Sequence, residues 1–245
     1  MLRTGERRRS DLDCSPWSCD IRGWTDCRFR SRPLDAIESH VCLLQQLVRV
    51  AEFQTLTYLS STRVYGSGKD TTEAADLHVN PNNPDDLYNI SKLAGESLCL
   101  HCGRQGMKIA RLSNVVGLRD DANTFLYQLL EEGCQTGRVV FRSTLESKKD
   151  YLHINDAVAL LARLSVSSST GIYNVAGGEG VRNSDVAKIL AEEMGFEVSV
   201  AEDALGSDFD SVDISKAKFE FGFAPERFGD YFPKFLGGYR KNKGI

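Results

Sequence analysis

The sequence predicts an α/β fold built on a parallel sheet. Leu56–Ser60 is a short apolar, β-branched and aromatic run that ends abruptly in hydroxyl side chains. A buried parallel strand has this pattern where it opens into a site. Residues 35–52 precede it with helical spacing of apolar side chains, and a second helix is expected from Asp85 to about Cys102. Strands that alternate with helices of this length are typical of a parallel sheet with crossover connections.

The bulk composition is that of an ordinary soluble globular protein rather than a nucleic-acid-binding or membrane protein. The chain has 245 residues, of which 41% are hydrophobic and 26% charged, so it is long enough to bury a sizeable core. The net charge of −4 argues against nucleic acid as a general partner. No apolar run approaches the ~18 residues of a membrane span. Seven cysteines, an odd number, suit a reducing cytoplasm better than a disulfide scaffold.

A tyrosine and a lysine in the second helix form the clearest chemical pattern. Tyr88 and Lys92 are four residues apart, so both project from one face of the helix. An ammonium beside a phenol stabilises the phenolate and lowers a pKa that starts near ~10. With Ser61 alongside, the tyrosine becomes a general acid/base next to a hydroxyl that can hold a substrate oxygen.

Five stretches in a fixed order carry a resemblance to a known family. Ser60–Gly66 and Tyr88–Lys92 resemble the extended short-chain dehydrogenase/reductases, the NAD-dependent sugar-nucleotide epimerase/dehydratase family. Three later stretches fit the same family in the same order: Arg111–Gly117, Lys149–Asp156 and Tyr173–Gly180. The resemblance runs from about Ser39 to the C-terminus. It implies a Rossmann-type parallel sheet, here truncated, with a small C-terminal α/β substrate domain.

The resemblance also implies a reaction and its residues. The family oxidises, reduces or epimerises nucleoside-diphosphate sugars with NAD or NADP, and its complete members form homodimers. Tyr88 would exchange a proton with a substrate hydroxyl, and Lys92 would lower the tyrosine pKa and hold the cofactor ribose. Ser61 would orient the same hydroxyl. Leu59 and Ser60 would lie against the cofactor.

Two further positions are candidate substrate contacts. Asn114 follows the strand Met107–Leu112, at the end where α/β sheets place ligand contacts, although a turn asparagine explains it equally well. Lys149 occupies a position where the family often has an arginine that clamps a diphosphate. Lysine supplies a positive charge there, but it lacks the pair of parallel N–H donors with which arginine binds a phosphate in a bidentate manner.

The residues after Ser61 depart from one branch of the family. Dehydratases of this family carry an Asp-Glu pair directly after the catalytic hydroxyl residue. Thr62 and Arg63 stand there in this chain. Neither supplies the carboxylate chemistry that water elimination needs, so the sequence predicts an epimerase or reductase rather than a 4,6-dehydratase.

The first 34 residues do not fit the family. They contain Arg7-Arg8-Arg9 and both tryptophans but show no helical or strand periodicity, so they are expected to be atypical and disordered. The family begins instead with a strand, a Gly-x-x-Gly-x-x-Gly turn that receives the cofactor pyrophosphate, and a helix. Gly5 and Gly23 do not have that spacing. A truncated or mis-started reading frame is the expectation, and an N-terminal arm that binds nucleic acid is the alternative.

The remaining segments define the expected division of the chain. The catalytic part is expected over 35–118 plus 149–166, and the substrate-binding part over 119–148 plus 167–245. Helices are expected over 122–133, ending at Gly133, from a cap at Asn155, over 183–194, from about 213 and over 231–239. Strands are expected at 139–141, 151–153 and 172–175. Gly66-Ser67-Gly68-Lys69 lacks the spacing of a phosphate loop and is expected to be a mobile loop.

Two alternatives remain open. Cys99 and Cys102 have the spacing of half a metal site, but no second pair follows, so a buried cysteine pair is expected and no metal. The missing glycine turn also allows a second function, in which the chain is a non-catalytic remnant that acts as a binding or interaction protein.

Overall fold

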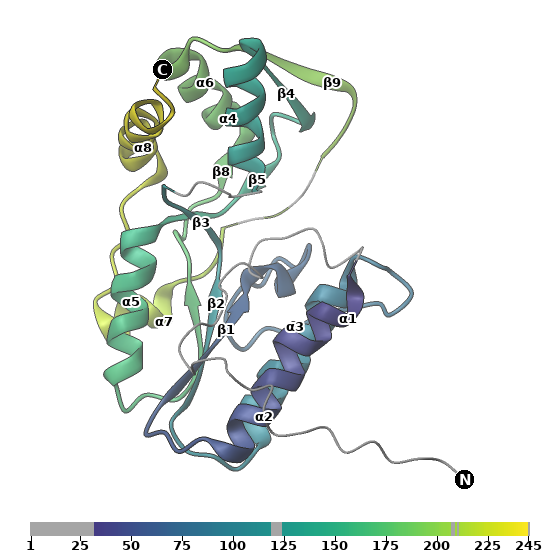
Figure 1. Cartoon of the computed structure of the whole chain (residues 1–245), viewed down its shortest axis with the longest axis vertical. Coiled ribbons are helices and arrows are strands. Elements are labelled where there is room, and N and C mark those ends of the chain that lie inside the picture. Colours follow the sequence, from purple (N-terminus) through teal and green to yellow (C-terminus); the bar gives the residue numbers. More distant parts are fainter. Residues whose placement is uncertain (1–31, 119–123, 207–208, 210, 245) are drawn as a thin grey trace, which may run out of the picture.

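The computed structural model describes residues 32–118, 124–206, 209 and 211–244. The expectations for residues 1–31 lie outside this part of the chain. The three-stranded sheet at the centre of the lower half in Figure 1 consists of β1 (Leu56–Ser61), β2 (Met107–Leu112) and β7 (Gly171–Val175). Its order is β1-β2-β7, and both pairings are parallel. The parallel sheet predicted from the sequence is confirmed.

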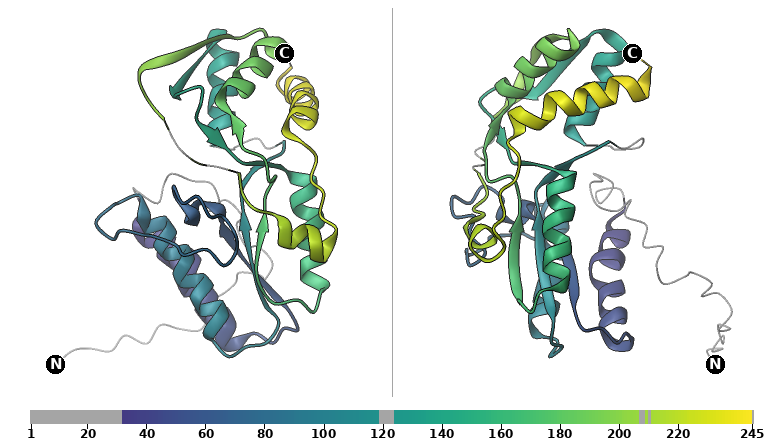
Figure 2. Two further views of the ribbon diagram at one scale, coloured as in Figure 1. Left: turned by 180° about the vertical axis from the view of Figure 1, so that it is seen from behind. Right: turned by 90° about the vertical axis from the view of Figure 1, so that its left-hand side faces the viewer.

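Helices cover both faces of this sheet (Figures 1 and 2). One face carries a continuous helical segment made of α1 (Pro33–Ile37), the π-helical turn Glu38–Cys42 and α2 (Leu43–Val50), together with α3 (Asp86–His101). The other face carries α5 (Ile154–Val166) and α7 (Ser215–Phe221). Every residue of β2 is buried, because this strand lies between two neighbours and under helices on both sides.

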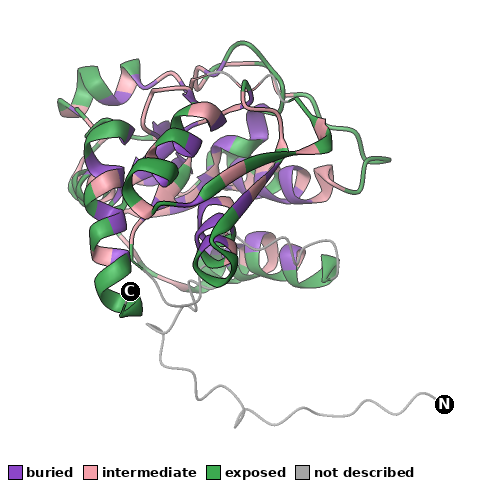
Figure 3. Ribbon diagram, turned by 90° about the horizontal axis from the view of Figure 1, so that it is seen from above, coloured by how far each residue is buried: buried purple, intermediate pink, exposed green. Residues whose placement is uncertain are grey.

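The upper half of Figure 1 is a second α/β unit with its own core. Its elements are α4 (Phe125–Thr136), β4 (Arg138–Ser143), α6 (Asn183–Met194), β9 (Glu197–Leu205) and α8 (Phe228–Lys243). β4 and β9 are parallel. Figure 3 shows the buried residues of these helices on the faces that turn inward.

Two small ladders lie between the halves. β3 (Asn114–Val116) runs parallel to β6 (Tyr151–His153), and β5 (Lys148–Lys149) is antiparallel to β8 (Val181–Arg182).

The division between the halves differs from the ranges expected from the sequence. β7 falls within 167–245, the expected substrate-binding part, yet it pairs with β2 in the catalytic sheet. α7 packs beside it, and Tyr173, Val175, Ile214 and Ala217 share one hydrophobic core with β2 and α5. The chain therefore returns to the first half twice, and local periodicity does not reveal such returns.

Two element ends and one helix cap also differ from the expectations. α4 continues past Gly133 and ends at Thr136, and the next residue, Gly137, has a φ of 73°, the left-handed conformation that favours glycine after a helix. α5 begins at Ile154, so the residue before the helix is His153 and not the expected cap Asn155. Asp85 precedes α3 as expected, but its side chain makes no capping hydrogen bond. The short helix from Thr62 to Tyr65 and the strand β9 had no counterpart in the sequence prediction.

Candidate active site

The end of β1 and the start of α3 bring Ser61 and Tyr88 together. Ser61 is the last residue of β1, and its side chain accepts a hydrogen bond from the backbone N–H of Arg63 at 3.2 Å. This contact starts a 3₁₀ turn that carries the chain away from the sheet. Tyr88 lies in the first turn of α3, and its phenol shares a hydrogen bond with the Ser61 side chain.

The Tyr88 ring lies close to the side chains of His40, Arg63 and Lys92. The ring of His40, from the π-helical turn, meets it edge-on at 5.2 Å between centroids. The Arg63 guanidinium lies 5.4 Å and the Lys92 ammonium 5.7 Å from the ring centroid. Burial raises the pKa of the phenol, while the Ser61 hydrogen bond and the Arg63 charge act in the opposite direction. The net direction is opposite to the lowering expected from the sequence, because desolvation of the phenolate outweighs the favourable contacts.

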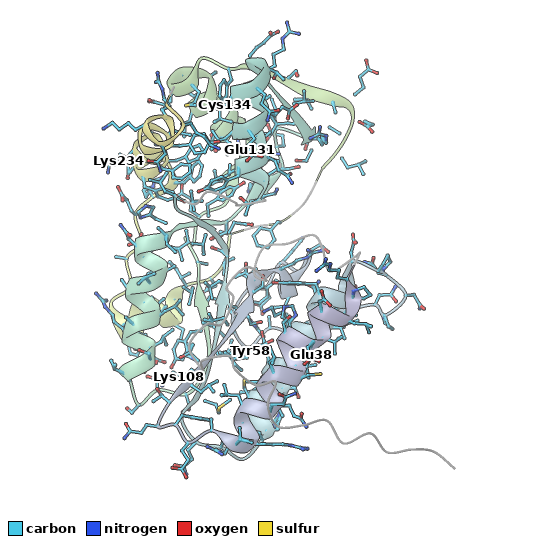
Figure 4. The ribbon with its side chains drawn as sticks, in the orientation of Figure 1. Glu38, Tyr58, Lys108, Glu131, Cys134 and Lys234 are labelled. Atoms are coloured by element: carbon cyan, nitrogen blue, oxygen red, sulfur yellow. The ribbon has the colours of Figure 1, made fainter. Side chains whose placement is uncertain are left out.

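Lys92 is fixed by the strand rather than by the tyrosine. Its Nζ donates to the backbone carbonyl of Leu59 at 3.0 Å, and it lies 5.5 Å from the ring centroid of Tyr58. Tyr58 is on the side of β1 that faces α3 (Figure 4). Burial lowers the pKa of Lys92 to about 8, although the Glu96 carboxylate raises it. Lys92 therefore changes its charge close to physiological pH.

The two residues expected to lie against a cofactor are placed differently from each other. The Leu59 carbonyl is the acceptor for Lys92, and its side chain packs on the α5 side of the sheet. The Ser60 hydroxyl is buried and donates to Glu96 at 2.5 Å. The side chain of Ser60 is thus turned toward α3.

The expected substrate residues lie beyond this cluster. Asn114 comes two residues after Leu112, which pairs in register with Ser61. Its side-chain amide donates to the Asp150 carbonyl at 2.8 Å. Lys149 lies in β5, and its Nζ is 3.5 Å from the ring centroid of Phe125 on α4. The structure therefore brings Ser61, Tyr88 and Lys92 into one cluster and places Lys149 in β5, with its ammonium over the Phe125 ring.

Sequence reasoning missed a buried ion pair next to the cluster. Arg111 on β2 donates to Glu96 on α3 through Nε at 3.0 Å and through Nη2 at 2.7 Å. Two signals could have revealed it. Glu96 continues the spacing of Tyr88 and Lys92 by one more helical turn, and Arg111 is a charged residue inside an apolar strand.

The backbone N–H groups of the glycine-rich turn after β7 are hydrogen-bonded to a side chain of the protein. The backbone N–H groups of Gly177, Gly178 and Glu179 donate to the buried carboxylate of Asp150. These three backbone donors are therefore already paired within the protein.

The part of the chain that the structure describes holds no group of three or more His, Cys, Asp or Glu side chains arranged for a metal ion. Cys99 is buried, and the Cys102 thiol lies 3.9 Å from the Cys99 carbonyl. None of the described helices combines the length and the apolar character that a membrane crossing requires.

The parallel sheet covered on both faces, with the Ser61–Tyr88–Lys92 cluster at the carboxyl ends of its strands, defines a Rossmann-type α/β chain. Residues 27–176 match the NAD dependent epimerase/dehydratase family. The chain belongs to that family.

Two curated relatives are similar over about two thirds of the chain. A dTDP-glucose 4,6-dehydratase of Streptomyces griseus is 28% identical over 175 residues, which cover 68% of this chain and 52% of the relative. A GDP-6-deoxy-D-mannose reductase of Pseudomonas aeruginosa is 29% identical over 176 residues, covering 66% and 56%. The chain thus spans about half the length of the curated relatives it matches.

Solved structures confirm the fold. A dTDP-glucose 4,6-dehydratase of Bacillus anthracis in complex with NAD superposes with a TM-score of 0.74 at 19% identity, covering 87% of this chain and 71% of that chain. The RMD protein of Pseudomonas aeruginosa complexed with NADPH has a TM-score of 0.71 at 23% identity, covering 88% and 76%.

Proposed function

We propose that this chain carries the acid/base and substrate-binding part of an NAD(P)-dependent oxidoreductase or epimerase that acts on a nucleoside-diphosphate sugar. One observation carries the proposal. The Ser61–Tyr88 hydrogen bond, with Lys92 one helical turn along α3, lies at the carboxyl end of β1. Open α/β sheets bind their ligands at this edge.

Tyr88 is the residue that moves the proton in this proposal. Its raised pKa keeps the phenol protonated at neutral pH, so it acts first as an acid toward a sugar oxygen or exchanges its proton with a sugar hydroxyl. Ser61 holds the same oxygen by its hydroxyl. Arg63 and Lys92 place positive charge beside the ring and favour the phenolate as it forms.

The residues present fit the nicotinamide end of a dinucleotide. A phenol, a hydroxyl and an ammonium converge at the strand ends, and this donor set suits a ribose and a carbinol. Tyr88 and Lys92 are assigned to the ribose, with the backbone at Leu59 and Ser60 beside it. When bound, NAD or NADP would accept or supply the hydride. Structures of similar fold contain NAD or NADPH, which supports this class of cofactor.

The sugar nucleotide is assigned to the junction between the halves. Asn114 lies just beyond the sheet edge, and Lys149 contributes a cation that suits a diphosphate. The curated relatives act on dTDP-glucose and GDP-6-deoxy-D-mannose according to their names. Similar structures contain UDP-glucose or UDP-glucuronic acid. These names support the class of substrate and leave the individual sugar to experiment.

We also assign a second copy of the chain to the exposed face of α2. Leu43, Leu47 and Val50 follow one another at helical spacing, and their exposures are 51%, 45% and 82%. Sedimentation of the purified chain should show a dimer, and Leu47→Glu should shift it toward the monomer. A wild-type monomer at tens of micromolar would refute this assignment.

The reaction is tested by incubating the chain with a panel of nucleoside-diphosphate sugars and either NAD or NADP. The expected result is a product epimerised, oxidised or reduced at a carbinol carbon, formed by the wild type but not by Tyr88→Phe. Equal rates in the two proteins would refute the role of Tyr88. A folded chain that turns over no member of the panel would favour the non-catalytic binding protein instead.

A further inference from the structure

Three residues of α3 meet three successive residues of β1. Tyr88, Lys92 and Glu96 are spaced by four, so they form one stripe on the helix. Lys92 donates to the Leu59 carbonyl at 3.0 Å, Ser60 donates to Glu96 at 2.5 Å, and Ser61 shares a hydrogen bond with Tyr88. Tyr88 and Lys92 already have roles in the proposed reaction, whereas Glu96 has none.

Glu96 is held from the other side by Arg111. The guanidinium uses two nitrogens to reach both carboxylate oxygens, at 3.0 and 2.7 Å. The two side chains are only 3% and 4% exposed. A buried ion pair contributes little net stability, because removing both charged groups from water offsets much of their mutual attraction. Its better attested use is to fix one arrangement of the elements that carry it.

The pair is the start of a longer buried chain of hydrogen bonds. Arg111 Nη1 donates to the Tyr65 hydroxyl at 3.0 Å, which donates to Asn174 Oδ1 on β7 at 2.8 Å. The Asn174 amide then donates to the carbonyls of Thr71 and Asp213. One polar path therefore joins α3 to all three strands of the sheet, and each link has a partner.

We propose that Glu96 is a positioning residue of the site: clamped by Arg111 and Ser60, it sets α3 against β1 and places its carboxylate beside the Lys92 ammonium. The inference rests on the proposed function, since Lys92 matters only if the cluster is an active site. It adds a role for a residue that touches neither substrate nor cofactor.

The effect of the Glu96 charge on the Lys92 pKa distinguishes a positioning role of Glu96 from a purely stabilising one. The titratable groups that face Lys92 are Glu96 and Tyr88 on α3, Tyr58 on β1 and His40 in the π-helical turn. Burial and the charge of Lys92 lower the pKa of His40 to about 3, so His40 stays neutral. The Glu96 carboxylate raises the pKa of Lys92 against the larger effect of burial. Loss of that carboxylate should therefore lower the Lys92 pKa further.

The experiment is an NMR titration of the chain labelled with ¹³C at the lysine ε-carbon. A Lys92→Arg variant identifies the Lys92 signal, whose midpoint is expected near pH 8 in the wild type. In Glu96→Gln, which keeps the size but removes the charge, the midpoint should fall by roughly one pH unit. Ser60→Ala is the matched control, because it removes a hydrogen bond to Glu96 and keeps both charges. Its midpoint should stay at the wild-type value.

A second variant keeps the test decisive if Glu96→Gln does not fold because Arg111 is left buried without its partner. Glu96→Gln combined with Arg111→Met removes both charges. Glu96 is the charged group that raises the Lys92 pKa, so the Lys92 midpoint should still fall, but by less than in the single variant, because loss of the Arg111 cation acts in the opposite direction. An unchanged midpoint in a folded variant overturns the proposal, since a purely structural role lowers stability without moving Lys92. The titration needs no substrate, so its failure is distinct from a failure of the proposed reaction.

Discussion

Gly95→Ala is a substitution for which helix propensity and tertiary packing predict opposite outcomes. Gly95 is buried inside α3, where alanine is intrinsically preferred by about 1 kcal/mol. A Cβ at this position would overlap the Tyr58 ring and lie 2.9 Å from the backbone carbonyl of His40. The ring and the carbonyl belong to two packed elements, so neither moves without cost.

The magnitude follows from these two opposing effects. Overpacking of a core costs typically ~1–3 kcal/mol, so the net loss after the gain in propensity is about 1 kcal/mol. For a chain of this size that loss corresponds to a decrease in Tm of roughly 2–4 °C. The matched control is Gly237→Ala in α8, where no atom lies within 4 Å of an added Cβ. There the propensity acts alone, and a gain of about 1 kcal/mol is expected.

Thermal and urea unfolding of both variants beside the wild type checks this prediction. A Gly95→Ala variant as stable as the wild type, or more stable, would refute the reasoning. It would mean that α3 does not approach β1 and the π-helical turn as closely as the structure shows. The spacing of the Ser61–Tyr88–Lys92 cluster would then be in question as well.

Three further outcomes test the site. Tyr88→Phe should reduce turnover at least ~10²-fold. It should cost only about 1 kcal/mol of stability, because the ring keeps its contacts with His40, Arg63 and Lys92. Turnover assays measure the first effect and thermal melting curves the second. Turnover that needs a charged Lys92 should fall as the pH rises through about 8, the value to which burial lowers its pKa; a rate that is flat to pH 10 would contradict this. Incubation with nucleoside-diphosphate glucose and NAD should give no 4-keto-6-deoxy product, because Thr62 and Arg63 lack the carboxylates for elimination; its accumulation at catalytic rates would overturn that argument.

The sequence by itself determined the parts that local patterns encode. The apolar run that ends at Ser61 predicted β1, and the four-residue spacing predicted that Tyr88 and Lys92 share a helix face. Both predictions rest on residues that are close together in the sequence, because the spacing and the composition of a short segment indicate its secondary structure directly. The hydroxyl at the strand end and the tyrosine on α3 do meet through a hydrogen bond.

Only the tertiary structure decided how the charges at the site behave. The sequence predicted that Lys92 lowers the pKa of Tyr88, whereas in the fold burial raises that pKa and the lysine is tied to the Leu59 carbonyl. Desolvation depends on every element packed around a group, and no local spacing reports it. Glu96 and Arg111 are 15 residues apart and meet only because α3 lies on β2. β7 likewise lies far along the chain from β2 and still pairs with it. This pairing depends on how the core packs in three dimensions and not on the residues next to β7 in the sequence.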